Sequence, residues 1–536
     1  MSLVRRIYSY VPRYHIRRRP ENRWKRWGQR LLVSIGVLAT AYLVFISYPQ
    51  RSYSVVAWVA WIPFIIGLFQ IRRPWVAFSY GWLTGFLFHL GLFYWIYYTC
   101  LHGGDLSVGL SVAAWMGLSA LLSLQTACWA AGSFYLTKTG WLFPLCCACG
   151  FVTLEWAHQT IAYYGLGFPW LMWGYSQWNA PEFLQIASFT GVYGVSFLLV
   201  FISACLGWAL VSGRLKNIVM SVLFCAIIWG GIYQWGKNRL AAIKPISSRA
   251  AVLQVAVVQP NIDQYKKWDP AFEQEIADTI SFFGQEIQTA PTDVVIWPES
   301  VTPGELTEEP YQQQMQTIAE KTQAFQVIGS SVTQENKQYV GAYLLAPNQI
   351  YFQMYRKQKL VPFGEYIPLE NLVRRLFPQV TILGQLGMFS SGPSVQPLLS
   401  LNDVLLGSTI CYEAIFPQVW RRQAKQGAQL FANLTNDAWF FDTDAPYQHL
   451  AANVLRAVET GRPVLRAANT GISAIIDEKG NIEQKSGLFE SELLRAAVTA
   501  EVSAPTFYAT YGDWLAWLCA VLFITVVIFS MVFMYE

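Results

Sequence analysis

The sequence predicts a helical membrane bundle of eight spans joined to an α/β domain, and three observations lead to this fold class. The chain of 536 residues is 54% hydrophobic and only 13% charged, whereas soluble domains carry about 25% charged residues. The apolar excess lies in residues 31–236 and 513–536. Residues 237–512 have an ordinary globular composition, in which apolar runs alternate with helical patterns.

Apolar stretches of about 20 residues are long enough to cross a bilayer as helices. Eight are expected, at residues 31–48, 54–70, 75–100, 107–136, 141–158, 185–211, 217–235 and 513–534. Buried helices of a soluble protein are the alternative, but a soluble core does not require so many apolar runs of this length. No small-residue cleavage site follows the first run, so a cleavable signal peptide is not expected.

The distribution of basic residues predicts the orientation of the bundle. Residues 1–30 contain ten Lys and Arg residues and one acid, which marks a basic cytoplasmic extension facing anionic lipid headgroups. Loops on the same side contain Arg72, Arg73, Lys138, Arg214 and Lys216. Seven spans then precede residues 237–512, which places that domain outside the cytoplasm. Residues 237–536 hold 22 basic and 29 acidic side chains, and this acidic balance argues against a nucleic-acid partner.

Seven apolar, β-branched runs between residues 237 and 512 predict buried strands. They are residues 251–260, 294–300, 326–332, 339–345, 404–411, 430–436 and 471–477. Residues 270–288 are amphipathic, and 446–460 begins with a proline at a first helical position. Fully apolar strands that alternate with helices indicate sheets covered on both faces.

Cys411 differs from the eight other cysteines, which lie in or at the ends of the predicted spans and are expected to be packing residues. It has no possible partner for a disulfide within residues 237–512. An oxidising compartment normally favours paired cysteines, so a lone thiol there is a candidate nucleophile. A buried, inert cysteine is the alternative.

A nucleophilic thiol needs a group that removes its proton, because its ordinary pKa of about 8.5 leaves little thiolate at neutral pH. His449, the only histidine of residues 237–512, could form a Cys–His pair. The other possibility is a carboxylate base with a cationic stabiliser. Glu299 and Lys357 suit it, since Glu299 lies at the end of an apolar strand and Lys357 precedes L-V-P-F-G-E.

The stretches W-P-E-S (297–300), Y-R-K-Q-K-L-V-P-F-G-E (355–365) and I-C-Y-E (410–413) resemble the nitrilase superfamily. That resemblance implies an α-β-β-α sandwich with a Glu–Lys–Cys triad. Further stretches are similar to the membrane-embedded branch of the superfamily, the bacterial apolipoprotein N-acyltransferases. They are residues 167–177, 267–269, 435–440 and 456–473. The similarity covers nearly the whole chain, apart from residues 1–30.

The resemblance implies that Glu299 is the general base, Lys357 the oxyanion stabiliser and Cys411 the nucleophile. It also implies supporting roles for Glu365, Tyr412 and Glu413, and substrate or lid roles for Trp268 and Trp439. The segment after Glu365 is rich in apolar residues, among them Phe377 and Phe389, and is expected to form an apolar arm over the site. The sequence departs from the family pattern at His158, Gly341 and Phe441, which leaves one loop conformation and one supporting hydrogen bond open.

By the same resemblance, the protein moves a fatty acyl chain from a phospholipid, typically the sn-1 chain of phosphatidylethanolamine, through a Cys411 thioester. The acceptor is the α-amino group of the diacylglyceryl-cysteine of apolipoproteins, in the last step of bacterial lipoprotein maturation. The implied protein is a monomer in the bacterial inner membrane, with a periplasmic catalytic domain and neither metal nor organic cofactor. A membrane-tethered amidase is one rival. A transporter is another, although the predicted spans contain almost no charge besides Glu155.

Overall fold

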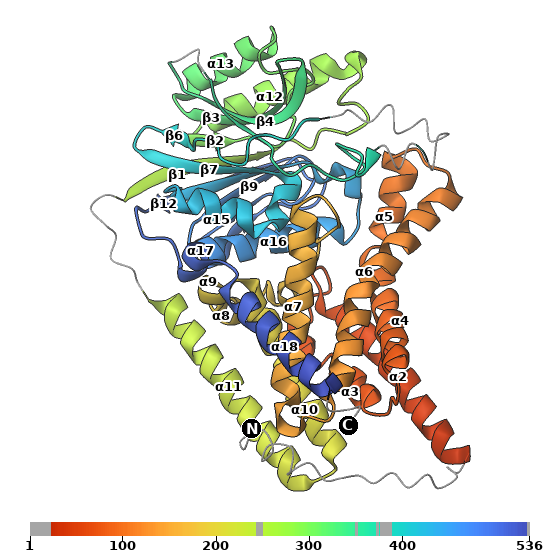
Figure 1. The fold of residues 1–536 in the computed structure, drawn as a ribbon. Helices are drawn as coiled ribbons and strands as arrows, with labels where there is room; N and C mark the ends of the chain where they lie inside the picture. The colour runs from red at the N-terminus through yellow and green to blue at the C-terminus, as the bar shows by residue number, and fades with distance from the viewer. Residues whose placement is uncertain (1–22, 243–249, 349–351, 371–374, 376–388, 533–536) are drawn as a thin grey trace.

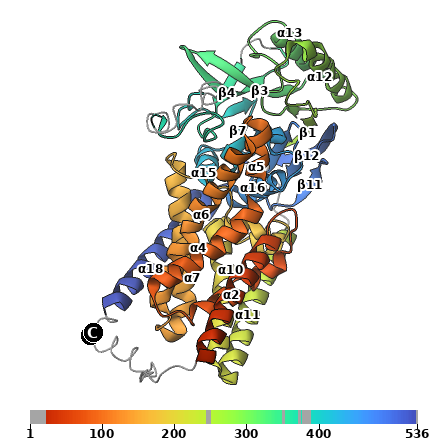
Figure 2. The ribbon, with the colours of Figure 1, turned by 90° about the vertical axis from the view of Figure 1, so that its right-hand side faces the viewer.

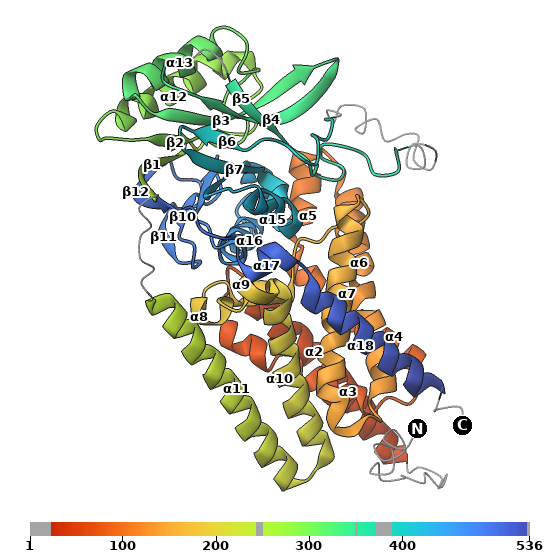
Figure 3. The ribbon, with the colours of Figure 1, turned by 60° about the vertical axis from the view of Figure 1, so that its left-hand side comes forward.

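The computed structural model describes residues 23–242, 250–348, 352–370, 375 and 389–532. A helical part forms one end of the molecule and an α/β part the other, as all three ribbon views show (Figures 1, 2 and 3). The longer helices of the helical part are α2 (Arg23–Ser47), α4 (Pro74–Leu92), α6 (Val108–Leu136), α7 (Phe143–Tyr163), α10 (Val192–Ser212), α11 (Leu215–Ala241) and α18 (Trp514–Val532).

Within the described residues, six helices are long and apolar enough to cross a membrane. They are Trp27–Ser47, Val108–Leu136, Gly140–Tyr163, Val192–Ser212, Leu215–Ala241 and Trp514–Val532. Helix α4 and the segment Trp95–Gly103 meet at a bend of 55° and make a seventh span if they are counted as one. The predicted count of eight is therefore not confirmed.

The predicted span at 54–70 is short and interrupted in the structure. It consists of the 3-10 helix η1 (Ser54–Trp58) and α3 (Ile62–Leu68). Pro63 lies in the first turn of α3, where a residue without an N–H is tolerated, so it begins a helix there. The predicted span at 185–211 likewise divides at Gly191, whose φ of 68° belongs to the left-handed region that favours glycine. It separates α9 (Ala187–Thr190) from α10.

Small residues allow the membrane helices to pack closely. A Cβ at Gly81 or Gly85 of α4 would lie 2.5–3.1 Å from atoms of Thr126, Ala130 or Ser123 of α6, which is closer than van der Waals contact. Helix α11, by contrast, lies at one side of the bundle against α10 (Figures 1 and 3). Only 6% of its apolar window is buried within the protein, which leaves its surface to lipid.

The α/β part contains two six-stranded sheets. The first has the order β12-β1-β2-β3-β4-β5 and the second β11-β10-β9-β8-β7-β6. The strands are β1 (Ala251–Gln259), β2 (Val294–Ile296), β3 (Phe325–Gln334), β4 (Lys337–Leu345), β5 (Phe352–Arg356), β6 (Leu399–Leu401), β7 (Val404–Ile410), β8 (Leu430–Thr435), β9 (Val464–Ala468), β10 (Ala474–Ile476), β11 (Ile482–Lys485) and β12 (Glu492–Ala500).

The two sheets face each other across one apolar core, and helices cover their outer faces, which confirms the predicted α-β-β-α sandwich. Helices α12 (Glu273–Ile287) and α13 (Tyr311–Thr322) pack on the first sheet, while α15 (Pro417–Lys425) and α16 (Ala445–Thr460) pack on the second. The α15–α16 layer lies toward the membrane helices, and a single apolar cluster extends from α16 into the bundle (Figures 1 and 3).

Candidate active site

Cys411 follows strand β7 directly and begins the short 3-10 helix η7 (Cys411–Ile415). Its φ of 48° lies in the left-handed region, which non-glycine residues seldom adopt. The turn places the residue at the edge of the inner core, where it is 8% exposed. A residue held in this conformation at the end of a buried strand is typical of a functional position.

Glu299, Lys357 and Glu365 form a buried cluster of charges. The Lys357 ammonium donates to Glu299 Oε1 at 3.0 Å and to Glu365 Oε1 at 2.6 Å. Glu299 follows β2 by three residues and Lys357 follows β5 directly, so the ends of two strands of one sheet supply the pair. Glu365 Oε2 also accepts the N–H of Val361 at 3.0 Å, which orients the second carboxylate.

Electrostatics in this cluster favour a charged lysine and a neutral resting thiol. Burial alone would lower the pKa of Lys357, but Glu299 and Glu365 together raise it well above its usual value. Burial raises the pKa of the Cys411 thiol, and the Glu299 carboxylate raises it further, while Lys357 acts in the opposite direction. The thiol therefore requires a proton acceptor before it can react.

Glu413 joins the segment after Lys357 to the strand that carries Cys411. Its Oε1 accepts the N–H groups of Gln358 (2.6 Å) and Lys359 (3.1 Å), and its Oε2 accepts the N–H of Ile410 (2.8 Å). The Tyr355 hydroxyl donates to the same carboxylate at 2.9 Å. Burial raises the pKa of Glu413 to about 7, although these N–H donors oppose the shift. The Glu413 carboxylate thus fixes the position of the backbone after Lys357 relative to the backbone before Cys411.

Tyr412 points toward the membrane side of the site. Its buried ring stacks on Phe168 at 5.9 Å and on Trp170 at 6.3 Å between centroids. Both partners belong to the loop that follows α7. The residue beside Cys411 is therefore in direct contact with the membrane helical part.

Three of the four residues predicted to form the lid or substrate entrance are among the described residues. Trp268 is 54% exposed on the loop after β1, and Trp439 is 39% exposed on the loop after β8. The Trp439 carbonyl accepts the Thr99 hydroxyl at 2.8 Å, which connects this loop to the segment after α5 (Trp95–Tyr98). The N–H of Phe389 donates to the Glu365 carbonyl at 3.1 Å. Phe377 lies outside the described residues.

His449 of α16 does not face the thiol. Its Nδ1 lies 2.8 Å from Asp437 Oδ1, and its Nε2 lies 3.0 Å from the carbonyl oxygen of Cys411. Burial, followed by Arg466, lowers the pKa of His449, whereas Asp437 raises it. The geometry therefore supports the carboxylate alternative for the base over the Cys–His pair.

Lys267 is a buried residue of the site that sequence reasoning missed. Its ammonium donates to the backbone carbonyl of Glu299 at 3.3 Å, and the side chain is 0% exposed. Burial lowers the pKa of Lys267 to about 8, although Glu299 raises it. The sequence signal for this residue was its place beside Trp268, a predicted lid residue. Two adjacent lysines next to an aromatic residue normally indicate a solvated loop, so Lys267 was not expected to be buried.

The three departures from the family pattern have distinct settings. Phe441 adopts a φ of 54°, a conformation that glycine adopts without strain. Gly341 lies in β4 opposite Ser330 and Arg356 of the neighbouring strands. His158 Nδ1 donates to the Gln125 amide oxygen Oε1 at 3.1 Å within the helical part.

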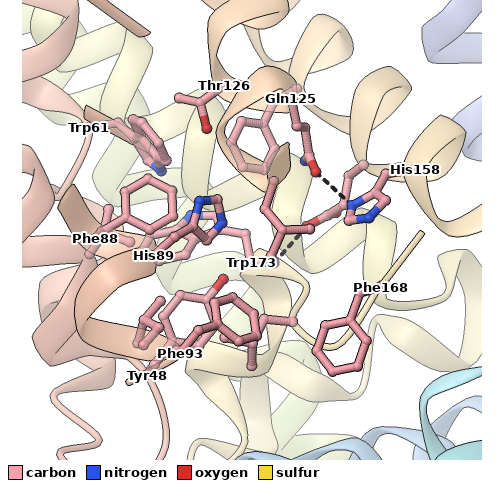
Figure 4. Close-up of a pocket in the computed structure, with 16 residues that line it drawn as sticks. Tyr48, Trp61, Phe88, His89, Phe93, Gln125, Thr126, His158, Phe168 and Trp173 are labelled. Carbon is pink, nitrogen blue, oxygen red and sulfur yellow. Dashed lines mark hydrogen bonds between the residues drawn. The ribbon is translucent and has the colours of Figure 1, made fainter. Parts of the chain in front are cut away.

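A cavity lined by both aromatic and polar side chains lies among the membrane helices (Figure 4). Its volume is about 40 Å³, which is room for a few water molecules. Polar side chains of His89, Gln125, Glu155 and His158 line it together with aromatic rings. Phe168 lines the cavity and also stacks on Tyr412, the residue after Cys411.

Two family models match the chain. Carbon-nitrogen hydrolase matches residues 254–507, and the apolipoprotein N-acyltransferase N-terminal domain matches residues 40–205. An apolipoprotein N-acyltransferase from Geobacter metallireducens is 33% identical over 89% of this chain and 91% of the relative. One from Haemophilus ducreyi is 32% identical over 83% of this chain and 86% of the relative.

Solved structures are similar at lower identity. A CN-hydrolase superfamily protein from Xanthomonas campestris has a TM-score of 0.37 and 17% identity, covering 47% of this chain and 91% of that chain. Nit3 from Saccharomyces cerevisiae, a member of branch 10 of the nitrilase superfamily, has a TM-score of 0.36 and 19% identity. It covers 49% of this chain and 94% of that chain.

Proposed function

Because the chain belongs to the apolipoprotein N-acyltransferase family, we propose that it transfers a fatty acyl chain from a phospholipid to the α-amino group of a diacylglyceryl apolipoprotein. The observation that carries the proposal is the buried Glu299–Lys357–Glu365 cluster beside a strand-end thiol, in a domain that packs directly on membrane helices. Such a site can form an acyl-enzyme, and its position gives it access to substrates that stay in lipid. Transfer through water would expose each CH₂ of the chain at a cost of about 0.8 kcal/mol.

In the first half-reaction, Glu299 takes the thiol proton and Cys411 Sγ attacks the ester carbonyl of the phospholipid. The tetrahedral intermediate breaks its bond to the glycerol oxygen, which takes the proton from Glu299 as it leaves. The products are a Cys411 thioester and a lysophospholipid. We assign the oxyanion to the Lys357 ammonium, since two carboxylates hold that side chain in a fixed and charged state.

In the second half-reaction, the apolipoprotein amine attacks the thioester carbonyl. Glu299 accepts a proton from the amine nitrogen, the C–S bond breaks, and the proton passes to the departing Cys411 thiolate. The products are an amide and the free thiol, so atoms and charge balance over the cycle. This ping-pong scheme needs no group other than those of the chain and its two substrates.

Glu365 and Glu413 have supporting roles in this proposal. Glu365 shares the Lys357 ammonium with Glu299, and Glu413 holds the segments of Lys357 and Cys411 together. We assign Trp268, Trp439, Phe377 and Phe389 to the substrate entrance. The Trp439 contact with Thr99 supports this, because it joins one edge of the site to a membrane segment.

The proposal includes an orientation in the bacterial inner membrane. Residues 1–30 are cytoplasmic, residues 31–236 and 513–536 are in the bilayer, and residues 237–512 are periplasmic, in a monomer. Basic residues in alternate loops support this arrangement, and the family is consistent with it.

The deciding experiment is the intact mass of the purified protein after incubation with phosphatidylethanolamine. We expect an added acyl mass that neutral hydroxylamine removes, together with release of lysophospholipid, and no such adduct on Cys411→Ala. An adduct that persists in Cys411→Ala would refute the nucleophile. Hydrolysis of small amides without any reaction with phospholipid would instead identify an amidase.

A further inference from the structure

We propose that His449 is a positioning residue for Cys411: its Nε2–H holds the Cys411 carbonyl and so fixes the turn that presents the thiol. The inference rests on the proposed role of Cys411 and adds a residue to that site. A hydrogen bond of 3.0 Å joins His449 Nε2 to the Cys411 carbonyl oxygen. Both residues are buried, His449 completely, so water does not replace this donor.

A buried frame fixes the imidazole ring in turn. Asp437 Oδ1 lies 2.8 Å from His449 Nδ1, and Arg466 Nη2 donates to Asp437 Oδ2 at 2.6 Å. Arg466 is itself held by the side chain of Asn433 at 2.9 Å and by the carbonyl of Ile472 at 3.0 Å. The hydrogen bonds therefore connect α16, the loop after β8 and strand β9 to the backbone of the nucleophile.

Asp437 Oδ1 and the Cys411 carbonyl oxygen are both acceptors, so each ring nitrogen must carry a proton for both hydrogen bonds to form. A charged imidazole donates to Asp437 from Nδ1 and to the Cys411 carbonyl from Nε2. In a neutral ring that keeps the Nε2 proton, Arg466 Nη2, 3.3 Å from Nδ1, is the donor to that nitrogen, and the Asp437 carboxylate then receives no hydrogen bond from the ring. Asp437 and Arg466 are the charged groups that contact the ring, and the Trp170 ring packs against it at 5.2 Å.

The same geometry separates this role from that of a base. Nδ1 of the ring faces Asp437 and Arg466 instead of the thiol. An acid–imidazole pair of this kind would serve a Cys–His enzyme only if the second nitrogen met the sulfur. Here the second nitrogen meets the carbonyl of the same residue.

The conformation of Cys411 explains why such a support matters. With φ at 48°, the residue is in a backbone region that persists only where surrounding contacts determine it. A rotation of this peptide would move the sulfur relative to the Glu299–Lys357 pair. Misplacement of a reacting atom by about 1 Å can cost roughly a hundredfold in rate.

The test compares single-turnover acylation of the full-length protein by phosphatidylethanolamine across four variants. His449→Leu removes the donor, His449→Gln returns an N–H near the position of Nε2, and Asp437→Asn weakens the support of the ring. Val458→Ala, buried on the same helix nine positions from His449, is the matched control. We expect roughly a hundredfold loss for the Leu variant, recovery of most of it with Gln, and an intermediate loss for Asn.

The pH dependence of acylation distinguishes positioning from proton transfer. We expect His449→Gln to keep the wild-type pH profile, because Glu299 remains the base, and the Leu variant to keep a folded melting transition. An unchanged rate in His449→Leu would overturn the proposal, and so would equal losses in Leu and Gln accompanied by a lost limb of the pH profile. Absence of a thioester in the wild-type protein would refute the proposed function itself, which is a different outcome.

Discussion

Lys357 is a single buried ammonium that serves two carboxylates, and its charge balance is central to the proposed chemistry. When the Cys411 proton moves to Glu299, one negative charge passes from the carboxylate to the sulfur. The ammonium remains beside both, so the transfer does not create an unpaired buried charge, which would be costly. The arrangement therefore makes the thiolate accessible even though burial raises the pKa of the thiol.

Glu299→Gln should block thioester formation, because the amide keeps the shape of the side chain but cannot take the thiol proton. General base catalysis contributes about 10²–10⁴-fold, so we expect a loss in that range in single-turnover acylation measured by intact mass. Glu320→Gln, on the exposed face of α13, is the control. A wild-type acylation rate in Glu299→Gln would require a different base.

Lys267→Met should change how stability depends on pH. Burial lowers the pKa of Lys267 in the folded protein to about 8, from an unfolded value of about 10.5. Above about pH 10.5 the lysine is neutral in both the folded and the unfolded state, and its contribution to stability is fully present. This contribution is lost as the pH falls through about 8, because the folded protein must then hold a buried charge. We expect the melting temperature of Lys267→Met to exceed that of the wild type at pH 7.

The check on Lys267 is a series of melting curves from pH 7 to pH 9.5 in one detergent. The advantage of Lys267→Met should shrink as the pH rises, with Lys266→Met, whose parent side chain is exposed, as the control. A difference that stays constant across the series would mean that the lysine contributes through packing alone.

At the scale of elements, we propose that the segment after Glu365 guides lipid to the site. The described part of the arm is tied down at Phe389, whose N–H bonds the Glu365 carbonyl and which forms a bridge with Gln338 of β4. The backbone of Phe389 thus lies beside the backbone of Glu365, a residue of the charged cluster. An apolar surface at this point would lower the cost of guiding an acyl chain out of the bilayer.

Replacing Phe377 and Phe389 together by serine should slow acyl transfer from long-chain phospholipid but spare alkylation of Cys411 by a small soluble reagent. The alkylating agent does not need an apolar path, and its rate depends on Glu299 and Lys357, which are unchanged. Both rates should be measured on the same protein, with Phe282→Ser on the exposed face of α12 as the control. Equal losses would mean that the arm supports the fold of the site, and equal retention that lipid enters elsewhere.

At the scale of the whole molecule, the α/β part and the membrane helices are joined by buried polar contacts. Gln448 of α16 accepts the indole N–H groups of Trp95 and Trp170 at 3.2 and 2.9 Å, and donates to the Leu92 carbonyl at 3.1 Å. A partly buried salt bridge between Arg51 and Asp444 reinforces the same junction. His449, the residue after Gln448, contacts the Cys411 carbonyl, so this junction is adjacent to the candidate nucleophile.

Gln448→Leu should weaken the attachment of the α/β part to the membrane helices. It leaves two buried indole N–H groups without an acceptor, and an unsatisfied buried group costs about 1–3 kcal/mol. We expect a lower melting temperature and faster proteolysis at the junction. Gln274→Leu, on the exposed side of α12, should change neither. An unaltered melting temperature in Gln448→Leu would show that apolar packing alone holds the parts together.

The sequence by itself determined the main features of this protein. Long apolar runs identify membrane helices because only helices satisfy the backbone within lipid, and alternating strand and helix patterns identify the covered sheets. Cys411 stood out because it is the only cysteine of residues 237–512. The motifs around Glu299, Lys357 and Cys411 indicated the family, and the sequence comparisons confirmed it.

Other features depended on contacts between residues far apart in the chain, which only the tertiary structure decides. The interruption between Ser54–Trp58 and Ile62–Leu68 and the bend after Leu92 are not apparent from composition, and the predicted count of eight spans is not confirmed. The strands β5, β6, β9, β11 and β12 were missed, because neighbouring strands stabilise them more than their own patterns do. Lys267 and His449 gain their settings from burial against Glu299 and Cys411, at separations of 32 and 38 residues. Hydrogen bonding across such distances leaves no local pattern, since it depends on which backbone groups the fold brings together.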